Sequence, residues 1–195
     1  RGRCSWQWFN LLVVAMALVV VARNAVLFLM AWEMMAIASF FLVAFDSERD
    51  QVRQAAWTYL VATHLGSALL LVMFVMIGNH TGSLDYAAWG NLKTAGQGFL
   101  NVLFVLGLIG FGVKAGMYPL HVWLPEAHPA APSHVSALMS GVMIKTGIYA
   151  LIRFMSLLGL PPPWWGWLVL GIGIASGILG VVFALAQHDI KRLLA

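Results

Sequence analysis

The stretch WWGWLVLGIGIASGILGVVFALA, residues 164–186, contains neither acidic nor basic side chains. A hydrocarbon core is roughly 30 Å thick, and a helix that rises about 1.5 Å per residue crosses it with about 20 apolar residues. Residues 164–186 therefore predict one transmembrane helix. Five earlier runs have a similar length and a mostly apolar content, near residues 5–22, 25–45, 55–78, 98–118 and 135–157.

The composition of the whole chain agrees with a membrane protein. Of its 195 residues, 62% are hydrophobic and 9% are charged, whereas a soluble domain carries about 25% charged residues. None of the six runs alternates as a transmembrane strand does, and backbone groups in lipid must be bonded within their own segment. We therefore predict an all-α fold, a polytopic transmembrane helix bundle of about six spans.

The chain is expected to be a piece of a longer protein. It begins with Arg1 rather than Met, and the final residues, HDIKRLLA at 188–195, resemble the start of another helix. We therefore expect residues 1–195 to form a single transmembrane domain that is truncated at both ends.

Basic residues lie mainly between the predicted spans and divide unequally between the two sides of the membrane. The N-terminal side has six and the opposite side three: Arg1, Arg3, Arg49, Arg53, Lys191 and Arg192 against Arg23, Lys93 and Arg153. Because lysine and arginine favour cytoplasmic loops, the N-terminal end is predicted to be cytoplasmic. The net charge of +4 is not gathered in a stripe, so we predict no nucleic-acid partner.

Redox cofactors are not expected in this chain. Cys4 is the only cysteine, which excludes an intrachain disulfide and an iron–sulfur cluster bound by this chain alone. A bis-histidine haem site needs histidines on two facing spans, but only His64 lies well inside a span. We therefore predict no cofactor, no metal site and no catalytic redox centre here, and assign any redox chemistry to partner subunits.

Three ionisable residues lie inside the predicted spans. Glu33 is close to the middle of the second span, Lys145 is close to the middle of the fifth, and Lys114 is near the end of the fourth. Each such charge costs roughly 2.5–3.5 kcal/mol at a helix centre on insertion scales, so it generally faces a partner or a wet cavity. Ion or proton conduction is the function that this pattern favours.

Two interpretations of these charges remain open. In one, a glutamate and a lysine neutralise each other and only hold helices together, which leaves one lysine unexplained. In the other, burial disfavours the charged lysine and a nearby carboxylate favours it, so a small change in their separation loads or releases a proton. His64 has the same two interpretations, a core histidine bonded to a neighbour or a member of a proton relay.

A proline-rich segment follows Lys114 directly. Pro119, Pro125, Pro129 and Pro132 prevent a continuous helix between the fourth and fifth spans. Transporters place such breaks at their ion sites, where irregular backbone lines a cavity, although in a cytoplasmic loop the prolines would be ordinary turn formers.

Aromatic and small residues near the ends of the runs have structural interpretations. Trp6, Trp8, Trp57, Tyr59, Trp164, Trp165 and Trp167 are interpreted as interface anchors. Gly173 and Gly177 have the spacing that lets a neighbouring helix approach closely.

Two long motifs resemble a known family. GFGVKAGMYPLHVWLPEAHPAAPS at 110–133 continues into HVSALMSGVMIKTGIYALIRF at 134–154, and both resemble the antiporter-like membrane subunits of respiratory complex I, Mrp-type cation/proton antiporters and membrane-bound hydrogenases. Within this family the motifs are most similar to the hydrogenase-4 and formate hydrogenlyase branches. LMAWEMMAIASFFLVAF at 29–45 and the ending at 188–195 extend the resemblance over essentially the whole chain.

The resemblance implies roles for the ionisable residues. Glu33 would be the acid of the family's fifth helix, Lys114 the lysine of its broken seventh helix and Lys145 a lysine of the eighth. Glu33 and Lys114 would form a pair whose changing separation switches the lysine, and Lys145 would continue the proton path. His134 and His64 are weaker candidates for the same path.

The resemblance also implies a larger assembly. Family members have about fourteen core helices in two inverted repeats, so these spans would be the fourth to the ninth, and a complete membrane pathway would need helices beyond residue 195. The implied function is proton translocation in the prokaryotic inner membrane, together with other membrane subunits and a peripheral redox module. Alternatives are an Mrp-type cation/proton antiporter subunit and a membrane scaffold that does not conduct.

Overall fold

The computed structural model describes the backbone of residues 2–194, and the side chains of that range apart from residues 2–4, 93 and 194. The charges of Arg1, Arg3 and Lys93, which were counted for orientation, therefore lie outside what is described. Over the described range the chain is helical and has no strands, which confirms the predicted fold class.

The elements follow one another as a series of helices with short connections. They are α1 (Gly2–Val21), α2 (Ala25–Val43), η1 (Ala44–Asp46), α3 (Asp50–Thr81), η2 (Tyr86–Thr94), α4 (Gln97–Ala115), α5 (Leu124–Ala130), α6 (Ser133–Leu138), η3 (Met139–Met143), α7 (Ile144–Leu157), α8 (Pro163–Leu185) and α9 (Ile190–Leu194). Both η1 and η2 are 3₁₀ helices, whereas η3 is a π-helical turn inside a longer helix.

Five helical segments of the described chain are long and apolar enough to cross a membrane. They are Ala25–Asp46, Asp50–Thr81, Gln97–Ala115, Ser133–Leu157 and Pro163–Leu185. The first predicted span corresponds to a shorter apolar helix, Ser5–Val21, within the described residues. Five of the six predicted spans are therefore long enough to cross a membrane. The remaining one, the first in the chain, is the shorter helix.

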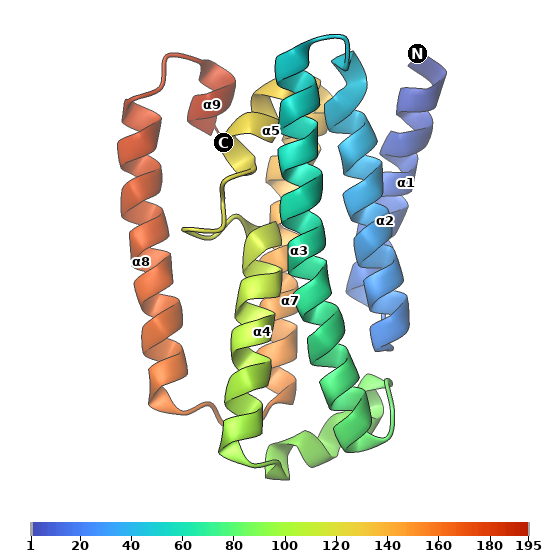
Figure 1. Cartoon of the computed structure of the whole chain (residues 1–195), viewed down its shortest axis with the longest axis vertical. Coiled ribbons are helices and arrows are strands. Elements are labelled where there is room, and N and C mark those ends of the chain that lie inside the picture. The colour runs from blue at the N-terminus through green and yellow to red at the C-terminus, as the bar shows by residue number, and fades with distance from the viewer. Residues whose placement is uncertain (1, 195) are drawn as a thin grey trace.

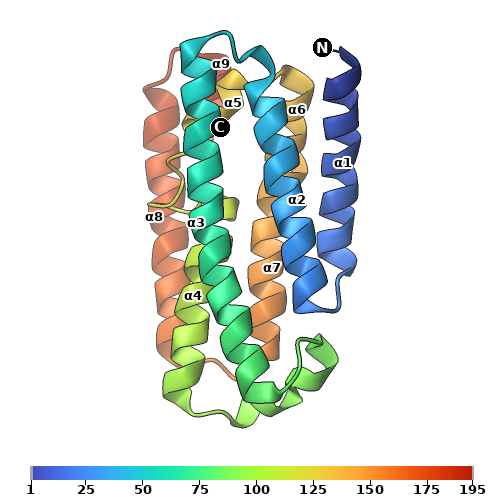
Figure 2. The same cartoon turned by 45° about the vertical axis from the view of Figure 1, so that its right-hand side comes forward.

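The long helices form an up-and-down bundle (Figures 1 and 2). The main packing pairs are α1 with α2, α2 with α3, α3 with α4, and α4 with α7. The connection from α2 to α3, together with α5 and α9, lies at the end of the bundle where α1 begins, whereas η2 lies at the other end (Figure 1). Arg49 and Lys191 are therefore at one end and Arg23 and Arg153 are at the other, as the alternation of spans predicts.

The turn between α1 and α2 is held by Asn24. Its side chain accepts a hydrogen bond from the backbone N–H of Val26 at 2.8 Å, which caps α2, and donates to Asp85 before η2 at 2.6 Å. An Asn at the N-cap satisfies backbone donors that a helix leaves unpaired. The first two helices are therefore joined by a tight hairpin at residues 23–24.

The predicted break after Lys114 is confirmed. Helix α4 ends at Gly116, whose φ of +66° suits glycine, and residues 117–123 then cross at mid-height of the bundle, between α3 and α8 (Figures 1 and 2). Helices α5 and α6 follow, separated at Ala131 and Pro132. The irregular backbone thus lies at the depth of the long helices rather than beyond their ends.

The interpretation as interface anchors is wrong for two residues, and the glycine spacing of α8 stays a prediction. Tyr59 and Trp165 are almost fully buried instead of anchoring at an interface, whereas Trp6, Trp57 and Trp167 are exposed. No atom lies within 4 Å of the position of a Cβ at Gly173 or Gly177, so no helix of the described chain packs closely there.

Candidate functional site

Lys114 is the centre of the candidate site. It lies in the last turn of α4, just before the break, and only 1% of it is exposed. Its Nζ donates a hydrogen bond to the hydroxyl of Tyr59 on α3 at 3.1 Å, and lies 5.4 Å from the centroid of that ring and 5.7 Å from that of Trp32 on α2. Cations favour such positions over aromatic faces. Three helices therefore surround this amine.

A line of hydroxyl groups leads away from Lys114 towards α2. The hydroxyl of Tyr59 forms a short hydrogen bond with Oγ of Ser39, and Ser39 Oγ also donates to the carbonyl of Met35 at 2.6 Å. Sδ of Met143, in the π-helical turn η3, lies 3.8 Å from the same Tyr59 hydroxyl. Tyr59 and Ser39 are both completely buried. Lys114 is thus joined to a buried polar chain that crosses from α4 to α3 and α2.

The segment between α4 and α6, residues 117–132 and called the broken segment below, closes the site from one side. The ring of Trp123 packs edge-on against Tyr59, with centroids 5.0 Å apart, and its Nε1 donates to the carbonyl of Val113 at 2.8 Å. The same carbonyl, in the last turn of α4, also accepts a hydrogen bond from the backbone N–H of Gly116 at 3.3 Å. The break therefore holds the end of α4, and Lys114 with it, in a fixed place.

Helix α7 approaches the same end of α4 closely. A Cβ at Gly147 would lie 2.7 Å from the backbone N of Ala115 and 3.0 Å from the carbonyl of Phe111. Only glycine allows this separation of the two backbones. Gly147 thus brings the helix that carries Lys145 against the helix that carries Lys114.

Glu33 pairs with a histidine rather than with Lys114. Its Oε2 lies 3.2 Å from Nε2 of His64, and the side chains are 32% and 48% exposed. His64 is thus half-exposed on the described chain, and its Nδ1 lies 2.9 Å from the carbonyl of Leu60. Glu33 Oε1 is buried without a hydrogen-bond partner in the described chain. Glu33 and Lys114 form no ion pair in this structure.

Lys145 and His134 lie apart from the Lys114 site. Lys145 is exposed on the described chain, and its Nζ donates to the carbonyl of Ser140 in the π-helical turn. His134 is at the start of α6, where its ring stacks on Trp6 at a centroid distance of 5.7 Å. Of the five predicted site residues, the structure joins Glu33 to His64 and surrounds Lys114 with aromatic and hydroxyl groups, and it leaves Lys145 and His134 separate.

Three buried polar residues were not predicted from the sequence. Tyr59 and Ser39 were not proposed as site residues, although each is a polar group inside an apolar run. His128 on α5 is also buried, with Nδ1 at 2.9 Å from Oγ of Ser136 and Nε2 without a partner among the described residues. Burial lowers the pKa of His128 below its usual value.

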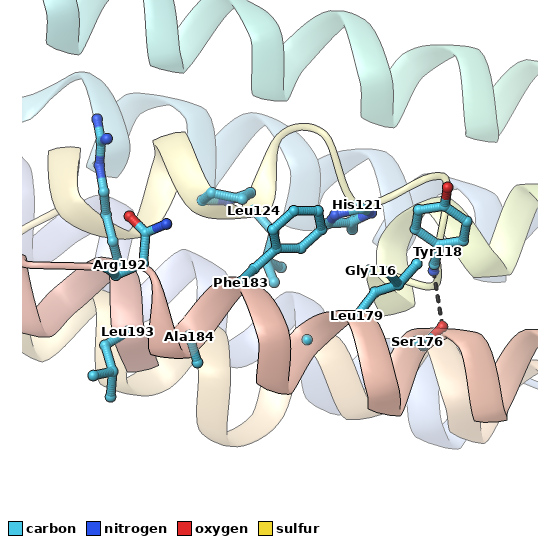
Figure 3. A pocket seen from close by; sticks show the side chains of 13 residues that line it. Gly116, Tyr118, His121, Leu124, Ser176, Leu179, Phe183, Ala184, Arg192 and Leu193 are labelled. Carbon is cyan, nitrogen blue, oxygen red and sulfur yellow. Dashed lines mark hydrogen bonds between the residues drawn. The ribbon is translucent and has the colours of Figure 1, made fainter.

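A cavity of about 340 Å³ lies between the broken segment and α8 (Figure 3). Gly116 and Tyr118 line one end, where the backbone N–H of Tyr118 donates to Oγ of Ser176 at 3.0 Å, and Arg192 lines the other. The ring of His121 faces Phe183 between them, with centroids 6.3 Å apart. The cavity reaches within two residues of Lys114 along the chain, and its lining is mostly apolar.

No group of three or more histidine, cysteine, aspartate or glutamate side chains within the described residues could hold a metal ion. The chemistry that this arrangement offers is the movement of protons between amine, carboxylate, imidazole and hydroxyl groups.

Residues 22–195 match the family model described as NADH:quinone oxidoreductase/Mrp antiporter, transmembrane. The chain belongs to this family.

Relatives with known names are considerably longer than this chain. It is 46% identical over 200 residues to hydrogenase-4 component B of Escherichia coli, and 31% identical over 193 residues to formate hydrogenlyase subunit 3 of the same organism. The alignments cover 100% and 99% of this chain but 29% and 30% of those proteins. The expected resemblance to both branches is confirmed.

Solved structures support the same conclusion about the fold. The chain superposes on the Mrp complex from Dietzia sp. with a TM-score of 0.88 and 30% sequence identity, over 95% of this chain and 20% of that chain. The relatives of this chain thus include proteins named as hydrogenase, formate hydrogenlyase and Mrp components, and the chain is similar to a part of them in sequence and in fold.

Proposed function

We propose that this chain is the proton-translocating part of a membrane subunit in a hydrogenase, formate hydrogenlyase or complex I-like oxidoreductase. One observation carries the proposal: Lys114 is completely enclosed next to a helix break and is bonded to a buried hydroxyl. A buried lysine can change its charge, and that change moves a proton. Antiporter-like membrane subunits of such complexes are the family to which the chain belongs.

Each predicted site residue receives a role in this proposal. Lys114 is the switching group. Glu33 tunes it electrostatically from the neighbouring face of α2, and His64, 3.2 Å from Glu33, shares or passes on the carboxylate's proton. Lys145 relays protons beyond Lys114, on the helix that Gly147 brings against α4. His134 lies in the first turn of α6 and stacks on Trp6 near the start of α1, so it would connect the path to that end of the bundle.

The surroundings of the chain follow from its charges and its family. We infer that it spans a prokaryotic plasma membrane with the N-terminal end of α1 in the cytoplasm, because four arginine and lysine residues of the described chain lie at that end: Arg49, Arg53, Lys191 and Arg192. Its partners would be other membrane subunits and a peripheral redox module that holds the electron carriers.

Proton translocation by the full complex in proteoliposomes tests the proposal. Lys114→Met and Glu33→Gln should each reduce protons moved per redox turnover, with Lys114→Met lowering them by about 100-fold, since a positioned proton-transfer group contributes at least this much. The rate of the redox reaction, measured without a membrane potential, should be retained. Unchanged pumping with unchanged redox chemistry in both variants would remove Glu33 and Lys114 from the path.

Similarity to the Dietzia Mrp complex favours a second candidate, a cation/proton antiporter subunit that works without redox drive. Sodium- or potassium-dependent proton movement in vesicles that lack any oxidoreductase partner would support it. For a scaffold that does not conduct, the double variant Glu33→Gln, Lys114→Met should assemble and leave ion transport unchanged, so the same preparations separate all three functions.

A further inference from the structure

We propose that Tyr59 is the partner that lets Lys114 exist in both charge states, and that its hydroxyl reverses its hydrogen bonds each time the lysine gains or loses a proton. The inference rests on the proposed function and adds Tyr59 to the residues that operate the switch. It starts from a simple observation. The hydroxyl of Tyr59 is the hydrogen-bond partner that the structure gives to Lys114 Nζ, at 3.1 Å.

The surroundings of Lys114 offer little else that could serve. Lys114, Tyr59 and Ser39 are buried, and the rings of Trp32 and Trp123 fill two further sides of the site. An ammonium group has three donors and no acceptor, whereas a neutral amine has a lone pair that needs a donor. A fixed acceptor such as a backbone carbonyl can accept from either form, but it cannot donate to the lone pair of the neutral amine. A phenolic hydroxyl can accept or donate, so it suits both forms.

The bonds beyond Tyr59 define the direction of the chain when Lys114 is charged. Ser39 Oγ has one hydrogen and lies 2.6 Å from the carbonyl of Met35, which can only accept. The Tyr59 hydroxyl must then donate to Ser39 Oγ, and its own oxygen is left to accept from Lys114. Every donor therefore points from Lys114 towards Met35, which is the order that an ammonium requires.

Deprotonation reverses this order without breaking any bond in Tyr59. The proton that leaves Lys114 goes to the carboxylate, imidazole or water that receives it along the path, and the Tyr59 hydrogen turns towards the Nζ lone pair. Ser39 can then donate to the Tyr59 oxygen in place of the Met35 carbonyl. Sδ of Met143, at 3.8 Å, is a weak acceptor beside the same hydroxyl and links the reversal to the π-helical turn before Lys145.

Tyr59→Phe in the full complex, reconstituted in proteoliposomes, is the first test. Loss of the hydroxyl should lower the number of protons moved per redox turnover by about tenfold. This factor corresponds to the free-energy cost of leaving a buried polar group without its hydrogen-bond partner. Tyr149→Phe is the matched control. Its hydroxyl is bonded to the carbonyl of Val20 at 2.9 Å, away from Lys114, so pumping should be unchanged. Full pumping by Tyr59→Phe overturns the inference.

A series of fluorinated tyrosines at position 59 separates this role from a structural one, and also covers poor folding of Tyr59→Phe. Each added fluorine makes the hydroxyl a stronger donor and a weaker acceptor while the ring keeps nearly the same shape. Pumping should change steadily along the series, whereas identical pumping in every member contradicts the role. Lys114→Met is measured in parallel. If that variant also pumps normally, the proposed function fails; if only the tyrosine variants pump normally, the role of Tyr59 fails alone.

Discussion

Two lysines lie within the long helices of this chain, and their surroundings differ. Lys114 is enclosed by α2, α3 and the broken segment, with a hydroxyl and two aromatic rings at its amine. Lys145 is exposed on the described chain and donates to a carbonyl of its own helix. The environment of Lys114 is therefore built by this chain alone, whereas a membrane environment for Lys145 requires further polar groups or water beside it.

The largest expected effect comes from the contact that joins the helices of the two lysines. Gly147→Ala places a Cβ 2.7 Å from the Ala115 backbone, which must force α7 away from α4. We expect a loss of roughly 1–3 kcal/mol in the free energy of unfolding, the usual cost of overpacking, together with reduced pumping. Thermal unfolding in detergent measures the first. Gly171→Ala on α8 is the control, because nothing lies within 4 Å of its Cβ position.

The other end of α7 offers a second way to disturb Lys145 without touching Lys114. Arg153 donates to the carbonyl of Val20 at 2.9 Å, and its guanidinium lies 5.1 Å from the ring centroid of Tyr86. Arg153→Met removes a charge-assisted bond to the end of α1, so we expect a loss of about 1–2 kcal/mol in the unfolding free energy. A thermal midpoint equal to that of the unmodified protein would show that this contact does not hold α7.

The smallest expected effect concerns His128, on the broken segment beyond Lys114. Because burial lowers its pKa, the folded state binds its proton less readily than the unfolded state does. Stability should therefore fall as the pH decreases below about 6.5, the ordinary histidine value. The thermal midpoint of the unmodified protein should drop more than that of His128→Asn between about pH 7.5 and pH 5.5. Equal drops would mean that His128 does not contribute to the pH dependence.

Much of the fold could be predicted because each long span depends only on local length and composition. The break after Lys114 was predictable for the same reason, since proline and Gly116 act locally. The short helices η2 and α5 were not predicted, because neither has the apolar length on which the prediction relied. The π-helical turn at Met139–Met143 also has no local feature that distinguishes it from a continuous helix.

The candidate site could be predicted by residue type but not by contact. Trp32 and Ser39 lie on one face of α2 at helical spacing, and they contact Lys114 and Tyr59 respectively. Glu33 follows Trp32 directly and so lies about 100° around the helix, where it meets His64 instead. Which side chains of α2 meet Tyr59 and which meet His64 depends on how α2 is rotated about its axis relative to α3. Tyr59 was predicted to be an interface anchor from its place near the end of a run. Its burial could not be predicted, because it depends on contacts with residues far along the chain.

The central claim is that Lys114 changes its charge within the bundle while the complex works. Solid-state nitrogen NMR of lysine-labelled complex in membranes observes this directly, with the Lys114 signal identified by its absence in Lys114→Met. We expect this signal to move between the ammonium and amine positions when the complex passes from rest to turnover. A Lys114 signal that remains at the ammonium position in both conditions would show that Lys114 does not change its charge.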